Sequence, residues 1–135
     1  MTDLSVLLAA ARGARARAHA PYSGFRVGAA ILDEAGVVHA GCNVENAAYP
    51  VGTCAEAGAI AAMVAAGGRE IRAILILGDG PEPVTPCGAC RQRIREFASP
   101  GTVIHVADLD GLRARFSLDA LLPHSFGPGH LGAAG

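Results

Sequence analysis

Apolar and polar positions alternate along this chain in short blocks, and each block predicts one helix or one strand. Residues 4–18 carry apolar side chains on one helical face and arginines on the other, which predicts an amphipathic helix capped by Asp3. Residues 26–32 and 37–44 are apolar runs on either side of a polar turn, and they predict an antiparallel hairpin. The continuous apolar run over residues 71–77 is typical of a strand covered on both faces.

The remaining blocks continue this alternation of helix and strand. Residues 53–66 are rich in alanine and predict a helix that ends at the pair Gly67-Gly68. Further elements are predicted at residues 87–97 (a helix), 103–107 (a strand), 114–117 (a weaker strand) and 117–122 (a short helix capped by Ser117), followed by a tail without regular structure. A hairpin followed by alternating helices and strands predicts an α/β fold, with helices packed on a mixed sheet of about five strands.

Length and composition limit what the protein can be. A chain of 135 residues, of which 51% are hydrophobic, predicts one folded domain over residues 1–135 rather than a disordered segment. The formal net charge is −1 and no basic block occurs, which argues against nucleic acid as a partner. The longest uncharged run of the hydrophobic middle, residues 57–68, is shorter than the roughly 20 residues needed to cross a bilayer. With no signal-peptide pattern at its start, we expect a soluble cytoplasmic protein with no membrane partner.

Residues 57–66 are apolar around nearly the whole circumference of the predicted helix. A helix without a polar face is covered on every side, and a small domain with few aromatic residues has little with which to cover one. We therefore predict a homo-oligomer with this helix at or near an interface. A central core helix of a monomer is the alternative.

Three of the four cysteines stand at the starts of two predicted helices. Cys87 and Cys90 are spaced C-x-x-C, which is typical either of half a zinc site or of a thioredoxin-like dithiol. Cys54 begins the other helix, so the two helix ends can bring three thiolates to one ion and leave a fourth tetrahedral position open, as in catalytic zinc sites. Cys42 could close that position. It lies inside a predicted strand, however, and a small buried apolar residue is the preferred interpretation.

A carboxylate follows two residues after Cys54. In the first turn of the helix, Glu56 can project over the helix end and touch a water bound to zinc without binding the metal. Zinc lowers the pKa of such a water to around 7, and Glu56 can then take its proton. Taken alone, Glu56 would simply complement the helix dipole. The neighbouring cysteines favour the catalytic interpretation.

The spacing of these residues resembles that of a known enzyme family. Cys54-Ala55-Glu56, followed by Pro86-Cys87-Gly88-Ala89-Cys90, is similar to the zinc signature of the small homotetrameric cytidine deaminases. Three further segments resemble that family in the same order: residues 21–30, residues 43–47 and residues 121–126. The resemblance covers nearly the whole chain and implies a three-layer α-β-α fold with a mixed five-stranded sheet.

The resemblance also implies a cofactor and a reaction. Cys54, Cys87 and Cys90 would bind one zinc ion per subunit, with a water or hydroxide in the fourth place. Glu56 would take a proton from that water, deliver it to the pyrimidine ring nitrogen and later help ammonia to leave. The activity implied is hydrolytic deamination of the nucleosides cytidine and 2′-deoxycytidine to uridine and 2′-deoxyuridine, a reaction of pyrimidine salvage.

Four further residues are implied in substrate binding. Asn43 and Glu45 match the residues that hold the ribose hydroxyls in family members, which suits an amide and a carboxylate. Turn chemistry at a strand end is the alternative for them. Phe25 would flank the base, and Phe126 is the residue that a neighbouring subunit of the homotetramer would contribute. Either phenylalanine could instead be buried in the core.

One position departs from the family. Many tetrameric members have an arginine directly after the catalytic glutamate, hydrogen-bonded to ligand sulfurs, where this chain has Ala57. Three thiolates on Zn²⁺ leave a net charge of −1. We therefore expect compensation from the two helix N-termini, from backbone N–H groups and from Arg91 beside Cys90. A solvated helix arginine is the alternative for Arg91.

Other functions stay open on the residues alone. A deaminase of another aminopyrimidine nucleoside, such as a cytosine-containing antibiotic, would use the same site. A small redox protein would use Cys87 and Cys90 but would leave Cys54 and Glu56 unexplained. A structural zinc module would need a fourth ligand. The five histidines have no ligand spacing to the cysteines, and we assign them no metal role.

Overall fold

The computed structural model describes residues 3–133, and within them five strands form one mixed sheet. The strands are β1 (Val27–Asp33), β2 (Val38–Cys42), β3 (Ile71–Gly78), β4 (Val103–Asp108) and β5 (Gly111–Ser117). Their order across the sheet is β2-β1-β3-β4-β5. β3 and β4 are parallel, and the other neighbouring pairs are antiparallel. The predicted hairpin and the mixed five-stranded sheet are confirmed.

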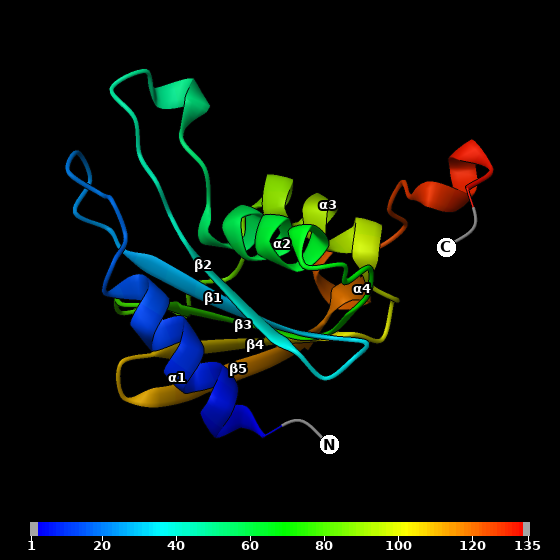
Figure 1. The fold of residues 1–135 in the computed structure, drawn as a ribbon, viewed down its shortest axis with the longest axis horizontal. Helices are drawn as coiled ribbons and strands as arrows, with labels where there is room; N and C mark the ends of the chain where they lie inside the picture. Colours follow the sequence, from blue (N-terminus) through cyan, green and yellow to red (C-terminus); the bar gives the residue numbers. More distant parts are fainter. Residues whose placement is uncertain (1–2, 134–135) are drawn as a thin grey trace.

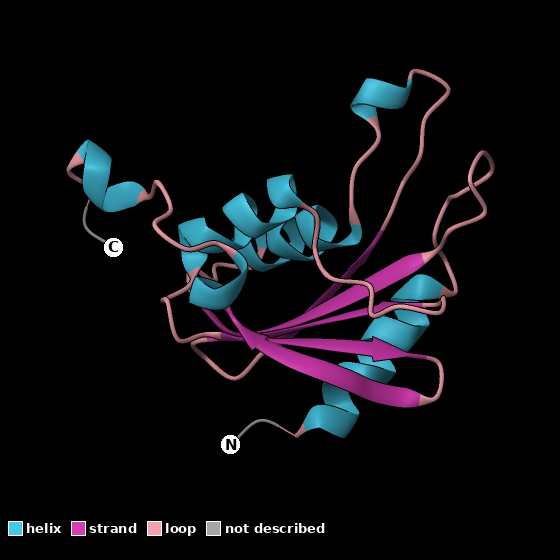
Figure 2. Cartoon of the chain, turned by 180° about the vertical axis from the view of Figure 1, so that it is seen from behind, coloured by secondary structure: helices cyan, strands magenta, loops and turns pink. Residues whose placement is uncertain are grey.

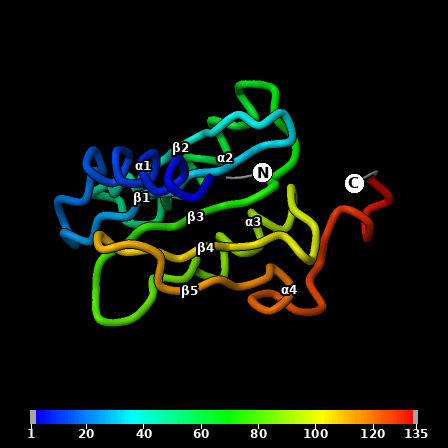
Figure 3. Tube along the Cα trace, turned by 90° about the horizontal axis from the view of Figure 1, so that it is seen from below, coloured from blue at the N-terminus to red at the C-terminus, as the bar shows by residue number. Residues whose placement is uncertain are grey.

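Helices cover both faces of this sheet (Figures 1 and 2). α1 (Leu4–Arg15) lies across β1, β2 and β3 on one face (Figure 3). α2 (Ala55–Ala65), α3 (Gly88–Phe97) and the short α4 (Leu118–Leu121) lie on the opposite face. The molecule therefore has the three α-β-α layers that the resemblance implies.

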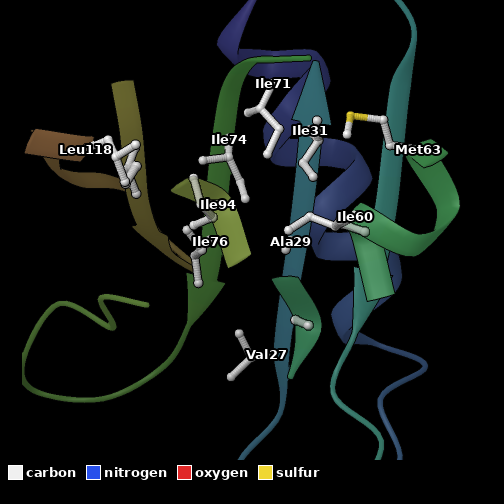
Figure 4. Packing of buried hydrophobic residues seen from close by; sticks show 13 residues of the cluster. Val27, Ala29, Ile31, Ile60, Met63, Ile71, Ile74, Ile76, Ile94 and Leu118 are labelled. Carbon is white, nitrogen blue, oxygen red and sulfur yellow. The ribbon is translucent and has the colours of Figure 1, made fainter. Parts of the chain in front are cut away.

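Side chains of β3 divide the core into two layers, because successive residues of a strand point to opposite faces. Ile74 and Ile76 belong to a buried cluster that also includes Ile94 of α3 (Figure 4). Leu75 and Leu77 belong to a second buried cluster, formed with α1. Both faces of β3 are covered, which explains the continuous apolar run in its sequence.

Two glycines allow helices to lie directly on the sheet. A Cβ atom at Gly28 of β1 would clash with the backbone carbonyl of Ala11 in α1. A Cβ atom at Gly41 of β2 would clash with the backbone of Ala59 and with the carbonyl of Ala55, both in α2. The contact at Gly41 therefore sets how closely the first turns of α2 approach the sheet.

Several predicted bounds differ from the structure. The first helix ends at Arg15 rather than at residue 18, and a turn follows it. The second strand of the hairpin ends at Cys42, and Val44 beyond it makes only isolated bridges. The last strand begins at Gly111, three residues earlier than predicted. Its exposed side chains include arginines, so its sequence lacks the apolar run by which a strand is predicted. The tail, predicted to be irregular, contains the short 3-10 helix η2 (Pro128–Leu131).

Within residues 3–133, every helix is too short or too polar to cross a bilayer.

Candidate active site

The starts of α2 and α3 carry the cysteines. Cys54 is the N-cap residue of α2 and Cys87 is the N-cap residue of α3, each with extended backbone and neither with a side-chain capping hydrogen bond. Cys90 lies in the first turn of α3 and is fully buried. The sulfur atoms of these three residues lie within 4.8 Å of one another. The two helix starts therefore converge as the sequence predicts.

The donor set of this cluster fits zinc. Thiolate sulfur is a preferred ligand of Zn²⁺, and three protein ligands are typical of catalytic rather than structural zinc sites. The two helix N-termini add the positive ends of their dipoles, which favour the thiolate form. Within the described residues Cys42 does not belong to the cluster, and it is a free cysteine on β2. It is half-buried rather than buried as the sequence predicted.

The three thiols differ in acidity. Burial raises the pKa of Cys54 and of Cys90 above the ordinary value for a thiol. Desolvation acts in the same direction on Cys87, but hydrogen bonds from the Cys90 backbone N–H and from the neighbouring thiols outweigh it and lower the pKa of Cys87. A thiolate therefore forms most readily at Cys87, and a divalent cation would supply the charge that the two more buried sulfurs need.

Glu56 is the second residue of α2 and exposes only 4% of its surface. Burial raises the pKa of the Glu56 carboxyl group. Its own backbone N–H and the positive charge of Arg93 act in the opposite direction, and desolvation outweighs both. A buried carboxyl group with a raised pKa exchanges protons near neutral pH more readily than an ordinary glutamate does, which is the property required of a proton shuttle.

A cavity of about 310 Å³ opens in front of this cluster, a volume in the range of small-molecule sites. Glu56, Cys54 and Cys87 line part of it. The remaining lining residues come from loops, from strands and from the start of α2: Phe25, Val27, Asn43, Val44, Glu45, Tyr49, Gly52, Thr53, Ala55, Ile76, Val84 and Thr85. Glu56, two of the three cysteines and the proposed nucleoside-binding residues therefore share one cavity, whereas the buried Cys90 and the exposed Phe126 do not line it.

The side chains of Asn43 and Glu45 tie together the two loops beside the cavity. Asn43 Oδ1 accepts a hydrogen bond from the Val27 backbone N–H at 2.9 Å, and Asn43 Nδ2 donates to the carbonyl of Phe25 at 2.8 Å. Glu45 accepts from the backbone N–H of Tyr22 at 2.9 Å and from both the N–H and the hydroxyl of Ser23. The turn chemistry that the sequence left open is thus present, and it positions both side chains at the cavity.

The two phenylalanines lie in different places. Phe25 lines the cavity and is 46% exposed, so it is not a core residue. Phe126 lies on the C-terminal segment, where it is 55% exposed and stacks on His130 with ring centroids 4.8 Å apart. The cavity of its own chain does not include Phe126.

The arginine next to a sulfur is not the one that the sequence indicated. Arg91 donates to the carbonyls of Pro86 and Leu121 and to the hydroxyl of Thr85 at 2.7, 2.8 and 3.3 Å, so its guanidinium is engaged by oxygen atoms. Arg93 Nη1 instead donates to Cys90 Sγ at 3.3 Å. The signal for Arg93 was its spacing, since residues three apart share one helical face, whereas adjacent residues do not.

The chain resembles known proteins over most of its length. Residues 1–106 match the family model described as the cytidine and deoxycytidylate deaminase zinc-binding region. The cytidine deaminase of Sporosarcina psychrophila is 41% identical over 124 residues, which make up 92% of this chain and 91% of that protein.

Solved structures agree with these sequence matches. A crystal structure of cytidine deaminase from Burkholderia pseudomallei is 42% identical, with a TM-score of 0.85 over 93% of this chain and 100% of that chain. A crystal structure of cytidine deaminase from Mycobacterium tuberculosis is 36% identical, with a TM-score of 0.80 over 94% of this chain and 99% of that chain.

An α/β layer fold with three cysteines at two helix starts and a buried carboxyl group beside them defines a zinc-dependent enzyme. Within that class, the chain belongs to the cytidine and deoxycytidylate deaminase family. Membership of this family favours the enzyme over the dithiol redox protein and over the structural zinc module.

Proposed function

We propose that this protein catalyses the hydrolytic deamination of cytidine and 2′-deoxycytidine to uridine and 2′-deoxyuridine, with release of ammonia. One observation carries the proposal: Glu56, Asn43, Glu45 and two of the cysteines, Cys54 and Cys87, line a single cavity, and the sulfur of the buried Cys90 lies within 4.8 Å of the other two sulfurs. Curated relatives that are 41% and 40% identical to this chain are named cytidine deaminases.

The reaction adds water at C4 of the pyrimidine ring and expels the amino group. Cys54, Cys87 and Cys90 would hold the zinc ion, which when bound lowers the pKa of a water to near 7. Glu56 takes one proton from the attacking water and places it on ring nitrogen N3. The same carboxyl group then takes the remaining proton from the hydroxyl group on C4 and passes it to the amino group, which leaves as ammonia while the C4 carbonyl forms. The raised pKa of Glu56 suits a group that must both accept and donate a proton.

The loop side chains keep enough hydrogen-bonding capacity for a ribose. Asn43 uses one of its two amide N–H groups and one lone pair of its oxygen on backbone partners, which leaves one donor and one acceptor. Glu45 accepts three hydrogen bonds, and a carboxylate has about four acceptor sites. Together they can bind the sugar hydroxyls while they hold the loops, and Phe25 can pack against the base.

We also propose a homotetramer in which Phe126 reaches the cavity of a neighbouring copy. Support comes from α2, on which Ala61, Ala62 and Ala65 are small apolar side chains left exposed by the single chain. Light scattering after size exclusion should give a mass four times that of the chain. Phe126→Ala should raise KM for cytidine without changing kcat by more than a few-fold.

Two further proposals concern the chain as a whole. We propose that it acts in the cytoplasm, because a site built from three free cysteines needs a reducing compartment. We also propose that residues 1–135 act as one domain, which is supported by the single sheet that collects the strands of residues 3–133.

The direct test is a spectrophotometric assay with cytidine, together with a measurement of zinc in the same sample. The proposal expects close to one zinc per chain and a loss of cytidine absorbance that depends on enzyme concentration. A folded, zinc-loaded sample that leaves both cytidine and 2′-deoxycytidine unchanged would refute it.

A further inference from the structure

We infer that Arg93 is the positioning residue that balances the negative charge of the three-cysteine site, and that α3 supplies this charge because α2 has no basic residue. The inference rests on the proposed function, since it assumes that the three sulfurs act together as thiolate ligands.

The helix geometry brings Arg93 to the cluster. Cys90 and Arg93 are three residues apart on α3 and therefore lie on one face of the helix. The long side chain of Arg93 starts at an exposed position, and its Nη1 atom lies 3.3 Å from the sulfur of the fully buried Cys90. Within residues 3–133, no carboxylate lies close enough to Arg93 to form an ion pair, so its positive charge is left for the sulfur.

The other arginines of α3 donate hydrogen bonds to oxygen atoms. Arg91 donates to three oxygen atoms. Arg95 donates to the hydroxyl of Ser125 at 2.9 Å. At position 57, three residues after Cys54 on α2, an arginine would have the same spacing to a cysteine that Arg93 has to Cys90, but the residue there is alanine. Among the described residues, the arginine that donates a hydrogen bond to a sulfur of the cluster is therefore Arg93 of α3.

A guanidinium that donates to a thiolate draws electron density from the sulfur, so the sulfur gives less of its charge to the metal. This lowers the net negative charge beside the reacting carbon without adding a contact to the substrate. Arg93 does not line the cavity, so its loss should reduce kcat and leave KM nearly unchanged. The helix N-termini and the backbone N–H groups stay in place, so the loss should be partial.

The test compares Arg93→Met, which keeps the apolar stem and removes the charge, with Arg72→Met at an exposed arginine of β3 that pairs with Glu70. We expect kcat for cytidine to fall about tenfold in Arg93→Met, the lower end of the range for residues that support metal ligands. KM should change less than twofold, and Arg72→Met should match the wild type.

Two readouts do not depend on activity. Zinc should pass to a chromogenic chelator several times faster from Arg93→Met than from the wild type, because the hydrogen bond that holds the Cys90 side chain in place is lost. In the cobalt-substituted protein, the sulfur-to-cobalt charge-transfer band should move to lower energy in Arg93→Met, because a sulfur without its hydrogen bond gives up electrons more easily. Arg93→Lys, which keeps a charge and a donor, should lie between the two and serves as the variant of choice if Arg93→Met does not fold.

A rescue variant completes the design. Ala57→Arg added to Arg93→Met should restore most of the lost kcat and return the cobalt band toward its wild-type position. Wild-type kcat, chelator rate and band position in Arg93→Met would overturn the inference. Failure of the proposed function would look different: a wild type that binds metal but leaves cytidine unchanged, in which the cobalt band still reports whether Arg93 touches the sulfur.

Discussion

Asp33 at the end of β1 and Glu56 in the first turn of α2 each expose 4% of their surface. Asp33 accepts hydrogen bonds from the His39 ring at 2.7 Å and from the backbone N–H groups of Val37 and Ala35. The hydrogen bond from His39, followed by that from Val37, lowers the pKa of Asp33. Glu56, in contrast, has its pKa raised by burial.

The difference shows which buried carboxyl group holds the fold and which one is free to react. A carboxylate that receives several hydrogen bonds is stable in its charged form and has no reason to take up a proton. A carboxyl group that is buried with fewer donors changes its protonation state easily, at some expense to stability. The hairpin end at Asp33 is thus a structural region, and the start of α2 is a reactive one.

The largest effect is expected from a comparison of substitutions at Cys54 and at Cys42. Cys54→Ser should abolish measurable deamination and lower zinc content far below one ion per chain, because it removes one of three donors at the cluster. Cys42→Ser on β2 is the matched control and should keep both zinc and activity. Loss of zinc in Cys42→Ser would show that the cluster has been assigned one cysteine too few.

The second largest effect is expected from a substitution that displaces α2 without changing any side chain of the site. In Gly41→Ala the new methyl group would push against the backbone of α2, the helix that carries Glu56. We expect a loss of about 1–3 kcal/mol in the free energy of unfolding, as for other overpacked cores, together with a lower kcat. Both are accessible from denaturant titration and the cytidine assay.

Gly28→Ala is the control on the opposite face of the sheet, where the clash is with α1. It should lose a similar amount of stability while kcat per folded molecule stays close to that of the wild type. If the two variants lose kcat equally, the position of α2 is not what tunes the site.

The smallest effect concerns the structural region and depends on pH. The native pKa of Asp33 is below its ordinary value of 3.8, so the unfolded chain binds the proton more tightly than the native chain does. The stabilisation by Asp33 is therefore complete above about pH 3.8 and is lost as the pH falls through the lower native pKa. Asp33→Asn should unfold at a lower temperature than the wild type at pH 7, and the gap should narrow below about pH 3.8. Kinetic constants at pH 7 should not change, and a gap that widens in acid would contradict the assignment.

Much of the fold could be predicted from the sequence, because the relevant signals are local. The continuous apolar run of β3 and the polar turn between β1 and β2 reflect burial and turn formation within a few residues. The start of β5 was missed because that strand lies at the edge of the sheet and exposes arginines on one side. The tail was missed because a short 3-10 helix leaves hardly any pattern in the sequence.

Some features of the site could likewise be predicted from the sequence, and others could not. The three cysteines could be placed together because a helix start is visible in the sequence and zinc chemistry requires the sulfurs to meet. The three-residue spacing placed Arg93 on the same helical face as Cys90, but the sequence could not show that Arg91 would donate instead to oxygen atoms of Pro86, Leu121 and Thr85. The hydrogen bonds that Glu45 accepts from Tyr22 and Ser23 could not be predicted either, because these two residues lie on a separate loop.

The most direct test of the account is Glu56→Gln, assayed with cytidine and analysed for zinc in the same preparation. The substitution keeps the shape of the side chain and removes its ability to carry a proton. We predict that kcat falls by about 10²–10⁴-fold, the range for a general acid–base residue, while zinc stays near one per chain and the melting temperature does not fall. A zinc-loaded Glu56→Gln protein that deaminates cytidine at the wild-type rate would contradict the assignment of Glu56 as the proton shuttle.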